Sequence, residues 1–161
     1  MTTQQDVLIK SAVDAWDLHI KRMNSLLAAL SDADLQQEVA PGKNTGVYLL
    51  GHLTAVNDAL LPLLGGGEKM YPALEPVFLR NPDKSGMEKP SVMDLRRYWE
   101  EVNARLASHL KQYTVSDWLQ KHGSISAADF EKEPHRNKLN VLTTRTTHLA
   151  YHLGQLVLLK K

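Results

Sequence analysis

Two histidines near the carboxyl end of the chain, His148 and His152, stand four positions apart. On an α-helix this spacing places both imidazoles on one face, one turn from each other. Neutral imidazole is a good ligand for divalent transition metals, so the pair could hold one ion. A third histidine, His52, lies in a leucine-rich stretch and could complete a three-histidine site. Three protein ligands leave one position of a tetrahedral ion open, which is typical of catalytic rather than structural zinc.

Arg145 lies one helical turn before His148 on the same stripe of residues. Its planar guanidinium matches a carboxylate, so one expectation is that it anchors an anionic group of a substrate or cofactor. The alternative is a salt bridge at the end of the bundle, with Glu100 or Glu101 as candidate partners. The sequence leaves both interpretations open.

Three further polar side chains lie one helical turn from a histidine, one before His52 and two after the histidines of the last helix. They are expected to orient a ligand or to face the same pocket. They are Tyr48, Tyr151 and Gln155. For Tyr151, core packing with a satisfied hydroxyl group is the alternative. Gly51 and Gly154 stand beside the proposed ligands inside predicted helices, where glycine costs about 1 kcal/mol relative to alanine. Close approach of helices or room for a substrate would account for both glycines.

Several other kinds of site are excluded by residue type. The chain has no cysteine, which rules out disulfides, thiolate metal sites and a cysteine nucleophile. It has no Glu-x-x-His sequence, the di-iron pattern of ferritin-like bundles. Leu149 stands where a His-Glu-x-x-His metalloprotease carries its glutamate. The other histidines lie in expected loops or lack a matching motif, and we interpret them as non-ligands: His19, His109, His122 and His135.

Four long amphipathic segments must position these residues. They cover residues 5–30, the stretch from Asn44 or Thr45 to residue 64, the stretch from Ser91 to residue 113, and residues 137–159. Apolar residues recur there at steps of three and four, which predicts helices. A short helix is expected over residues 116–121, and strand patterns are sparse. The prediction is an all-α four-helix bundle whose last helix turns its polar, histidine-bearing stripe inward.

The connection over residues 65–90 is too long for a simple turn. It holds three consecutive glycines and four of the seven prolines, whereas antiparallel neighbours in a bundle need only a short loop. One expectation is that it travels the length of the bundle, so that the second and third long helices are parallel. The other is that it folds over one end as a lid.

Composition limits the class of protein. The 161 residues correspond to a single domain, here taken as 1–161, with 43% hydrophobic and 23% charged residues. A net charge of +1 offers no strong attraction for nucleic acid or an anionic membrane. No apolar run is expected to approach the ~20 residues of a membrane span. The first 30 residues do not resemble a signal peptide, so the cytoplasm is the expected compartment.

Two motifs carry a resemblance to a known family. The stretch Asn44-Thr45-x-x-x-Leu49-x-x-His52-Leu53 is similar to the second-helix motif of the DinB-like (DinB/YfiT-type) metalloenzyme superfamily. The stretch His148-x-x-Tyr151-His152-x-Gly154-Gln155 resembles the last-helix signature of that family. The resemblance covers the whole chain and implies a four-helix bundle with up-down-down-up topology. It also implies a metal triad at His52, His148 and His152, and a homodimer.

The resemblance extends to activity in a broader way. Characterised relatives include thiol-dependent S-transferases that use mycothiol or bacillithiol, and a maleylpyruvate isomerase, while other relatives are described as metal-dependent hydrolases. The expected cofactors are therefore one divalent ion, Zn or Ni, and a low-molecular-weight thiol. The expected function is a metal-dependent enzyme acting on a small molecule, with thiol transfer first and hydrolysis second. A metal-binding protein without turnover and a purely structural bundle stay open as alternatives.

Overall fold

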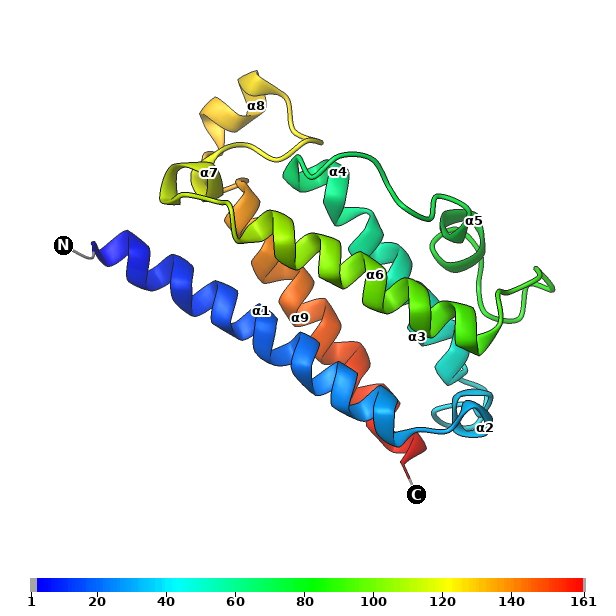
Figure 1. Ribbon diagram of the computed structural model, residues 1–161. Helices are drawn as coiled ribbons and strands as arrows, with labels where there is room; N and C mark the ends of the chain where they lie inside the picture. The colour runs from blue at the N-terminus through cyan, green and yellow to red at the C-terminus, as the bar shows by residue number, and fades with distance from the viewer. Residues whose placement is uncertain (1–2, 161) are drawn as a thin grey trace.

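Helices make up the regular structure of the chain. The computed structural model describes residues 3–160, and this range contains no β-strand. Long helices form the body of the molecule (Figure 1): α1 (Gln4–Ala29), α3 (Gly46–Asp58) followed directly by α4 (Leu60–Leu64), α6 (Val92–Leu110) and α9 (Lys138–Leu156). The prediction of an all-α protein with four long helical segments is confirmed for this part of the chain.

Shorter helices connect the long ones, and most of them were not predicted. One of them, α7, lies within a residue or two of the short helix expected over residues 116–121. The others occupy stretches interpreted as loops or as the end of a long helix. The short helices are α2 (Asp32–Leu35), α5 (Leu74–Phe78), α7 (Val115–Leu119), α8 (Ala127–Lys132) and η1 (Val157–Leu159).

Side-chain caps fix where the long helices begin. Thr45 has extended backbone geometry, and its hydroxyl accepts a hydrogen bond from the backbone N–H of Tyr48, so it caps α3 in preference to Asn44. Ser91 caps α6 in the same way. The carboxamide oxygen of Asn137 accepts from the third residue of α9. Each cap accepts a hydrogen bond from an N–H group that the helix itself leaves unpaired. The capping residue types therefore allow these helix starts to be predicted from the sequence.

The long helices pack around one apolar core. Helix α1 lies along α9, α3 lies against α6, and α3 also contacts α9. The predicted apolar stripes of α1 and α6 face this core, in which Trp99 and Met23 are among the largest fully buried side chains. The observed packing is that of a helical bundle.

Helix α9 faces the core with a different stripe from the one expected. Its leucine stripe is buried in the bundle: Leu142, Leu149, Leu153 and Leu156. The adjacent polar stripe, from Arg145 to Gln155, is only half-buried. The prediction that this polar stripe points inward is therefore wrong. The apolar stripe packs into the core because burying a guanidinium and two imidazoles there would cost free energy. The polar stripe lies at the edge of the bundle, toward α3.

The connection over residues 65–90 runs from the end of α4, past α5, to the start of α6 (Figure 1). Helix α5 packs against the side of α3, so the segment follows the bundle and does not cover its end as a lid. The buried carboxylate of Asp83 anchors it. That carboxylate accepts hydrogen bonds from the N–H and hydroxyl of Thr45 and pairs with Lys89 at 2.8 Å. The cap of α3 is thereby tied to the connection.

One apolar stretch is longer than the sequence analysis expected. Residues 46–64, which form α3 and α4, are long and apolar enough to cross a membrane by length and composition alone. Seventy-two percent of the stretch is buried inside the molecule. The core helix of a globular domain passes the same test, so the feature is weak support for a membrane span.

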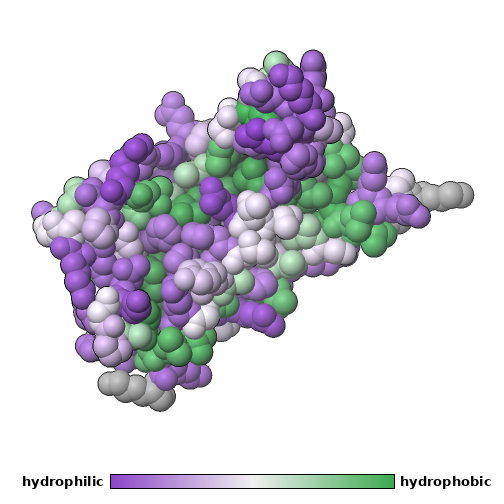
Figure 2. Space-filling model, turned by 180° about the vertical axis from the view of Figure 1, so that it is seen from behind, coloured by the Kyte–Doolittle hydropathy of each residue, from purple (hydrophilic) through white to green (hydrophobic). Residues whose placement is uncertain are grey.

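The surface opposite the view of Figure 1 is mixed in character (Figure 2). Helix α8 contributes no buried residue and projects as a largely hydrophilic bulge. Apolar residues gather near both chain ends, where Val7, Leu8, Val157 and Leu158 are exposed. Apolar side chains of this kind are common on protein surfaces and need no special explanation.

Candidate metal centre

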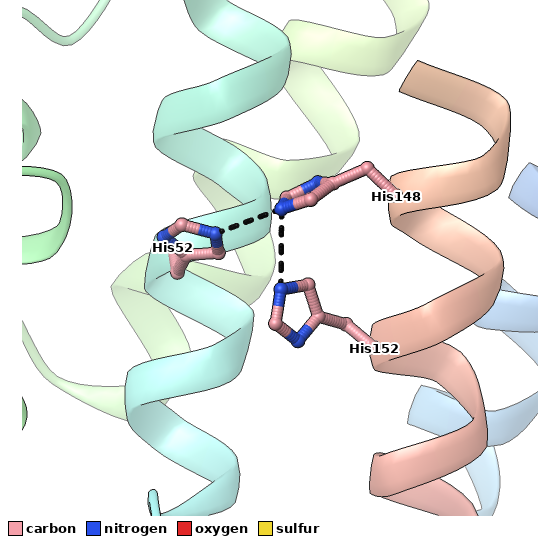
Figure 3. Close-up of side chains that lie close together, drawn as sticks. All are labelled: His52, His148 and His152. Carbon is pink, nitrogen blue, oxygen red and sulfur yellow. Dashed lines mark hydrogen bonds between the residues drawn. The ribbon is translucent and has the colours of Figure 1, made fainter. Parts of the chain in front are cut away.

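Three histidines from two helices meet at the edge of the bundle (Figure 3). His52 comes from α3, and His148 and His152 come from successive turns of α9. The Nε2 atom of His148 lies 3.2 Å from Nε2 of His52 and 3.2 Å from Nε2 of His152. One nitrogen of each ring lies within 4.8 Å of the others. The sequence analysis named these three residues, and the fold brings them together.

The spacing of the nitrogen atoms fits a metal ion. Zn–N bonds of ~2.0–2.1 Å at tetrahedral angles place two nitrogens about 3.3 Å apart. Both Nε2–Nε2 distances to His148 are close to that value, at 3.2 Å. Two of the three edges of the cluster therefore already have the length that a tetrahedral ion requires.

Hydrogen bonds hold two of the rings in the orientation a metal ligand needs. Nδ1 of His52 lies 2.9 Å from the backbone carbonyl oxygen of Phe78. Nδ1 of His152 lies 2.7 Å from the carboxamide oxygen of Gln155. Because each oxygen accepts, each Nδ1 carries the proton, which leaves the lone pair of Nε2 directed toward the cluster.

The third ring leaves polar atoms without partners. Nδ1 of His148 is buried and has no hydrogen-bond partner. If its proton is on Nε2, that buried Nδ1 keeps an unsatisfied lone pair. If its proton is on Nδ1, three lone pairs face one another. A cation at the centre relieves the second arrangement, since all three nitrogens then bind it, so the donor set fits a divalent ion.

The environment keeps the rings of His148 and His152 neutral, which is the form that binds metal. Burial, followed by the nearby His152, His52 and Arg145, lowers the pKa of His148 to about 4. Burial also lowers the pKa of His152, although the hydrogen bond with Gln155 acts in the opposite direction. At neutral pH, protons therefore do not compete with a metal for these two nitrogens.

The depressed pKa of His148 predicts a pH-dependent stability in metal-free protein. Unfolded histidine titrates near ~6.5, and folded His148 at about 4. Between these values the folded chain binds fewer protons than the unfolded chain, so the free energy of unfolding falls as the pH falls. Allowing for solvent screening, we expect His148 to contribute about 1 kcal/mol of this loss between pH 7 and 4.

Urea denaturation across this pH range measures the effect. The variant His148→Gln keeps a polar side chain but cannot titrate, so its stability should depend less steeply on pH than that of the wild type. Carboxylates elsewhere contribute equally to the pH dependence of stability in both proteins. An identical slope in the two proteins would contradict the assigned pKa.

The polar residues around the histidines take different positions. Tyr48 is buried, its ring stacks on His52 with centroids 6.3 Å apart, and its hydroxyl donates to the carbonyl of Asn81 at 2.7 Å. The ring of Tyr151 meets His152 edge-on at 5.0 Å, yet the residue is 65% exposed. The core-packing alternative for Tyr151 is therefore wrong. Tyr48 packs against one ligand, while Tyr151 borders another from the solvent side.

Gln155 provides a direct test of ligand orientation. Replacing it with leucine removes the acceptor for Nδ1 of His152, which frees that ring to rotate and to change tautomer. We expect the affinity for Zn²⁺ to fall about 10- to 100-fold, the usual cost of losing a partner of a ligating histidine. Competition with a fluorescent chelator measures the affinity. Gln155→Glu, which keeps an acceptor, is the matched control and should bind at least as tightly as the wild type.

The hydrogen-bond partner of His52 could not be predicted from the sequence. The carbonyl of Phe78 lies in α5, and a backbone acceptor leaves no trace in side-chain patterns. Gly51 offered an indirect signal. A Cβ atom on it would lie 2.3 Å from the ring of Phe78, so glycine permits the close approach of α5 to α3. Gly154 has no neighbour within 4 Å of the equivalent position, so close packing does not explain it.

Arg145 forms no salt bridge with the partners considered from the sequence. Glu101 instead pairs with Arg97 and accepts a hydrogen bond from Tyr71. Within residues 3–160, no ion pair or hydrogen bond involves the side chain of Arg145, and its Nε atom is buried without a partner. The salt-bridge interpretation is therefore wrong for this range. The histidines interpreted as non-ligands lie outside the cluster: His19, His109, His122 and His135.

These features define a class: an all-helical bundle protein with a three-histidine cluster shared between two of its long helices. Comparison with known families gives the same assignment. The model of the DinB superfamily matches residues 15–156, and the chain belongs to this superfamily. The matched range includes all three histidines. A search of curated proteins finds no match.

Proposed function

We propose that this protein is a metal-dependent enzyme that acts on a small molecule, with one divalent ion, Zn or Ni, held by His52, His148 and His152. The observation that carries the proposal is the convergence of three histidine nitrogens within 4.8 Å, two of whose separations, at 3.2 Å, suit a tetrahedral ion. Three ligands leave a position for a fourth, exchangeable group, which favours a catalytic over a structural role.

The chain supplies orientation and protonation state. The carbonyl of Phe78 and the carboxamide of Gln155 hold two rings with their lone pairs toward the centre. Burial keeps His148 and His152 neutral. When bound, a divalent ion supplies Lewis acidity, which lowers the pKa of an adjacent water or thiol and so provides a nucleophile at neutral pH.

Thiol transfer to an electrophilic small molecule is the reaction we favour, with hydrolysis second. Among the described residues, the cluster consists of histidines alone, with no carboxylate to serve as a base. A free thiol has a pKa near ~8.5 and bulk water near ~15.7, so a thiol ionises with far less assistance. A site without its own base is thus better suited to a thiol.

We also propose that the bundle has up-down-down-up topology. The contacts of α1 with α9 and of α3 with α6 support this order. The course of the ribbon supports it as well, because the connection from α4 to α6 leads back to the end where α3 begins (Figure 1). Helices α3 and α6 would then run in the same direction.

A turnover assay on reconstituted protein tests the proposed function. Metal-free protein is loaded with Zn²⁺ or Ni²⁺ and incubated with 1-chloro-2,4-dinitrobenzene and a panel of low-molecular-weight thiols. We expect a thiol-dependent rate that disappears on chelation and in His52→Ala. One bound equivalent of metal with ester hydrolysis but no thiol transfer would favour the second reaction. Trace metal in the purified protein, with no uptake of added ion, would refute the proposal.

A further inference from the structure

The side chain of Arg145 differs from those of two arginines on α6. Arg96 donates to backbone carbonyls at the end of α1, and Arg97 pairs with carboxylates of its own helix. Arg145 is half-buried, and its side chain forms no ion pair or hydrogen bond within residues 3–160. Its Nε atom is buried without a partner. An unpaired guanidinium that is partly withdrawn from water costs free energy. A fold tolerates such a cost most readily at a site where a ligand supplies the missing partner.

The position of Arg145 places this unpaired charge beside the histidine cluster. It precedes His148 by three residues on α9, a rise of about 4.5 Å along the helix. Nδ1 of His148 is also buried without a partner. Two neighbouring polar groups on one helix face therefore lack a hydrogen-bond partner.

We propose that Arg145 binds a carboxylate group of the substrate or thiol cofactor, next to the three-histidine site. The placement of that carboxylate beside the ion rests on the proposed function. The inference narrows the ligand class to small carboxylic acids whose reacting group lies within a few bonds of the carboxylate. Arg145 is in this view a binding residue, and the histidines provide the reactive position.

The charge at this position favours a carboxylate over a phosphate. Lys138 stands two turns before Arg145 on the same stripe of α9, but its ammonium group lies over the ring of Tyr113. Arg145 is therefore the cation of this stripe that is nearest to the histidines. A single planar guanidinium matches the shape and charge of one carboxylate through two parallel hydrogen bonds. A phosphate dianion would call for further donors that this face lacks.

Nuclear magnetic resonance of the arginine Nε–H groups tests the proposal directly. The full-length, ¹⁵N-labelled protein is titrated with acetate, with chloride at equal ionic strength and with inorganic phosphate, both metal-free and loaded with Zn²⁺. The Arg145 signal is assigned by its loss in Arg145→Lys. We expect acetate to shift this signal saturably, and chloride to leave it in place. Loading with Zn²⁺ should tighten acetate binding at least tenfold.

Two variants separate the role of Arg145 from general effects of charge. In the Zn²⁺-loaded protein, Arg145→Gln should bind acetate at least tenfold more weakly while retaining one equivalent of metal. Arg22→Gln removes another arginine without an ion pair, one that is exposed on α1, and should leave acetate binding unchanged. Arg145→Lys keeps the charge and most of the side chain, and should give intermediate affinity if the bidentate contact matters.

Several results would overturn the inference. These are acetate affinity within twofold of wild type in Arg145→Gln, a response to phosphate but not to acetate, and loss of metal on removing Arg145. The proposed function fails separately. If the protein takes up no metal but acetate still shifts the Arg145 signal, the carboxylate site stands and the metal site falls. If metal binds and acetate has no effect on the Arg145 signal, the metal site stands and the carboxylate site falls.

Discussion

The double variant His148→Ala, His152→Ala is expected to bind Zn²⁺ at least 10⁴-fold more weakly than the wild type. Apparent zinc-binding free energies of about 10–16 kcal/mol for four-ligand sites correspond to about 3 kcal/mol per ligand. The double variant keeps only His52, whose partner ligands both come from α9. Elemental mass spectrometry of the purified proteins should find close to one equivalent of metal in the wild type and background in the variant.

A matched control separates loss of the site from loss of histidine as such. His19→Ala, His135→Ala also removes two histidines, neither of which belongs to the cluster, and should keep the full metal content. Added Zn²⁺ should raise the melting temperature of the wild type and of this control, because an ion that binds only the folded state stabilises it. If Zn²⁺ raises neither, the three histidines do not form a metal site.

Gly51→Ala is expected to destabilise the protein by about 2–3 kcal/mol, which lowers the melting temperature by roughly 5–10 °C. The new Cβ would lie 2.3 Å from ring atoms of Phe78, and that ring is fully buried. The ring and its backbone must therefore shift. Because the carbonyl of Phe78 orients His52, the affinity for Zn²⁺ should also fall, about tenfold. Thermal denaturation and chelator competition measure the two effects.

Gly154→Ala is the natural comparison, since it makes the same change in the last long helix. Apart from the adjoining backbone of its own helix and its two chain neighbours, no heavy atom lies within 4 Å of its new Cβ. The variant should therefore be unchanged or more stable by up to ~1 kcal/mol. The double variant Gly51→Ala, Phe78→Leu should recover part of the lost stability by making room for the methyl group. Wild-type stability in Gly51→Ala alone would contradict the packing described for α5.

Helix positions and the members of the histidine cluster could be predicted from the sequence because each has a local cause. Thr45 and Asn137 mark helix starts through their capping side chains. Apolar residues that recur at steps of three and four identify the buried helix faces. Trp16 and Trp99 belong to such stripes and are buried. The histidines could be named because their spacing on α9 and a matching histidine on α3 suit one ion.

Other features depend on tertiary contacts that leave no such pattern. Helix α5 has five residues and no side-chain cap, so no local sequence signal predicts it. The acceptor for His52 is a main-chain carbonyl, which every residue possesses. The choice between two adjacent stripes of α9 depended on which one α1 and α3 would cover, and the apolar one was covered. The isolation of Arg145 likewise became visible only when its potential partners were found elsewhere.

The hydrogen bond between His52 and the carbonyl of Phe78 joins the candidate metal site to a segment that contributes none of its histidines. Anything that loosens α5 frees the ring of His52, and by thermodynamic reciprocity an ion that fixes the ring holds α5 more firmly against α3. The amide hydrogens around Phe78 should therefore exchange more slowly with solvent as the ion is added. The exchange rate of the connecting segment would then depend on how much of the site is occupied, and the segment would become more ordered as more metal binds.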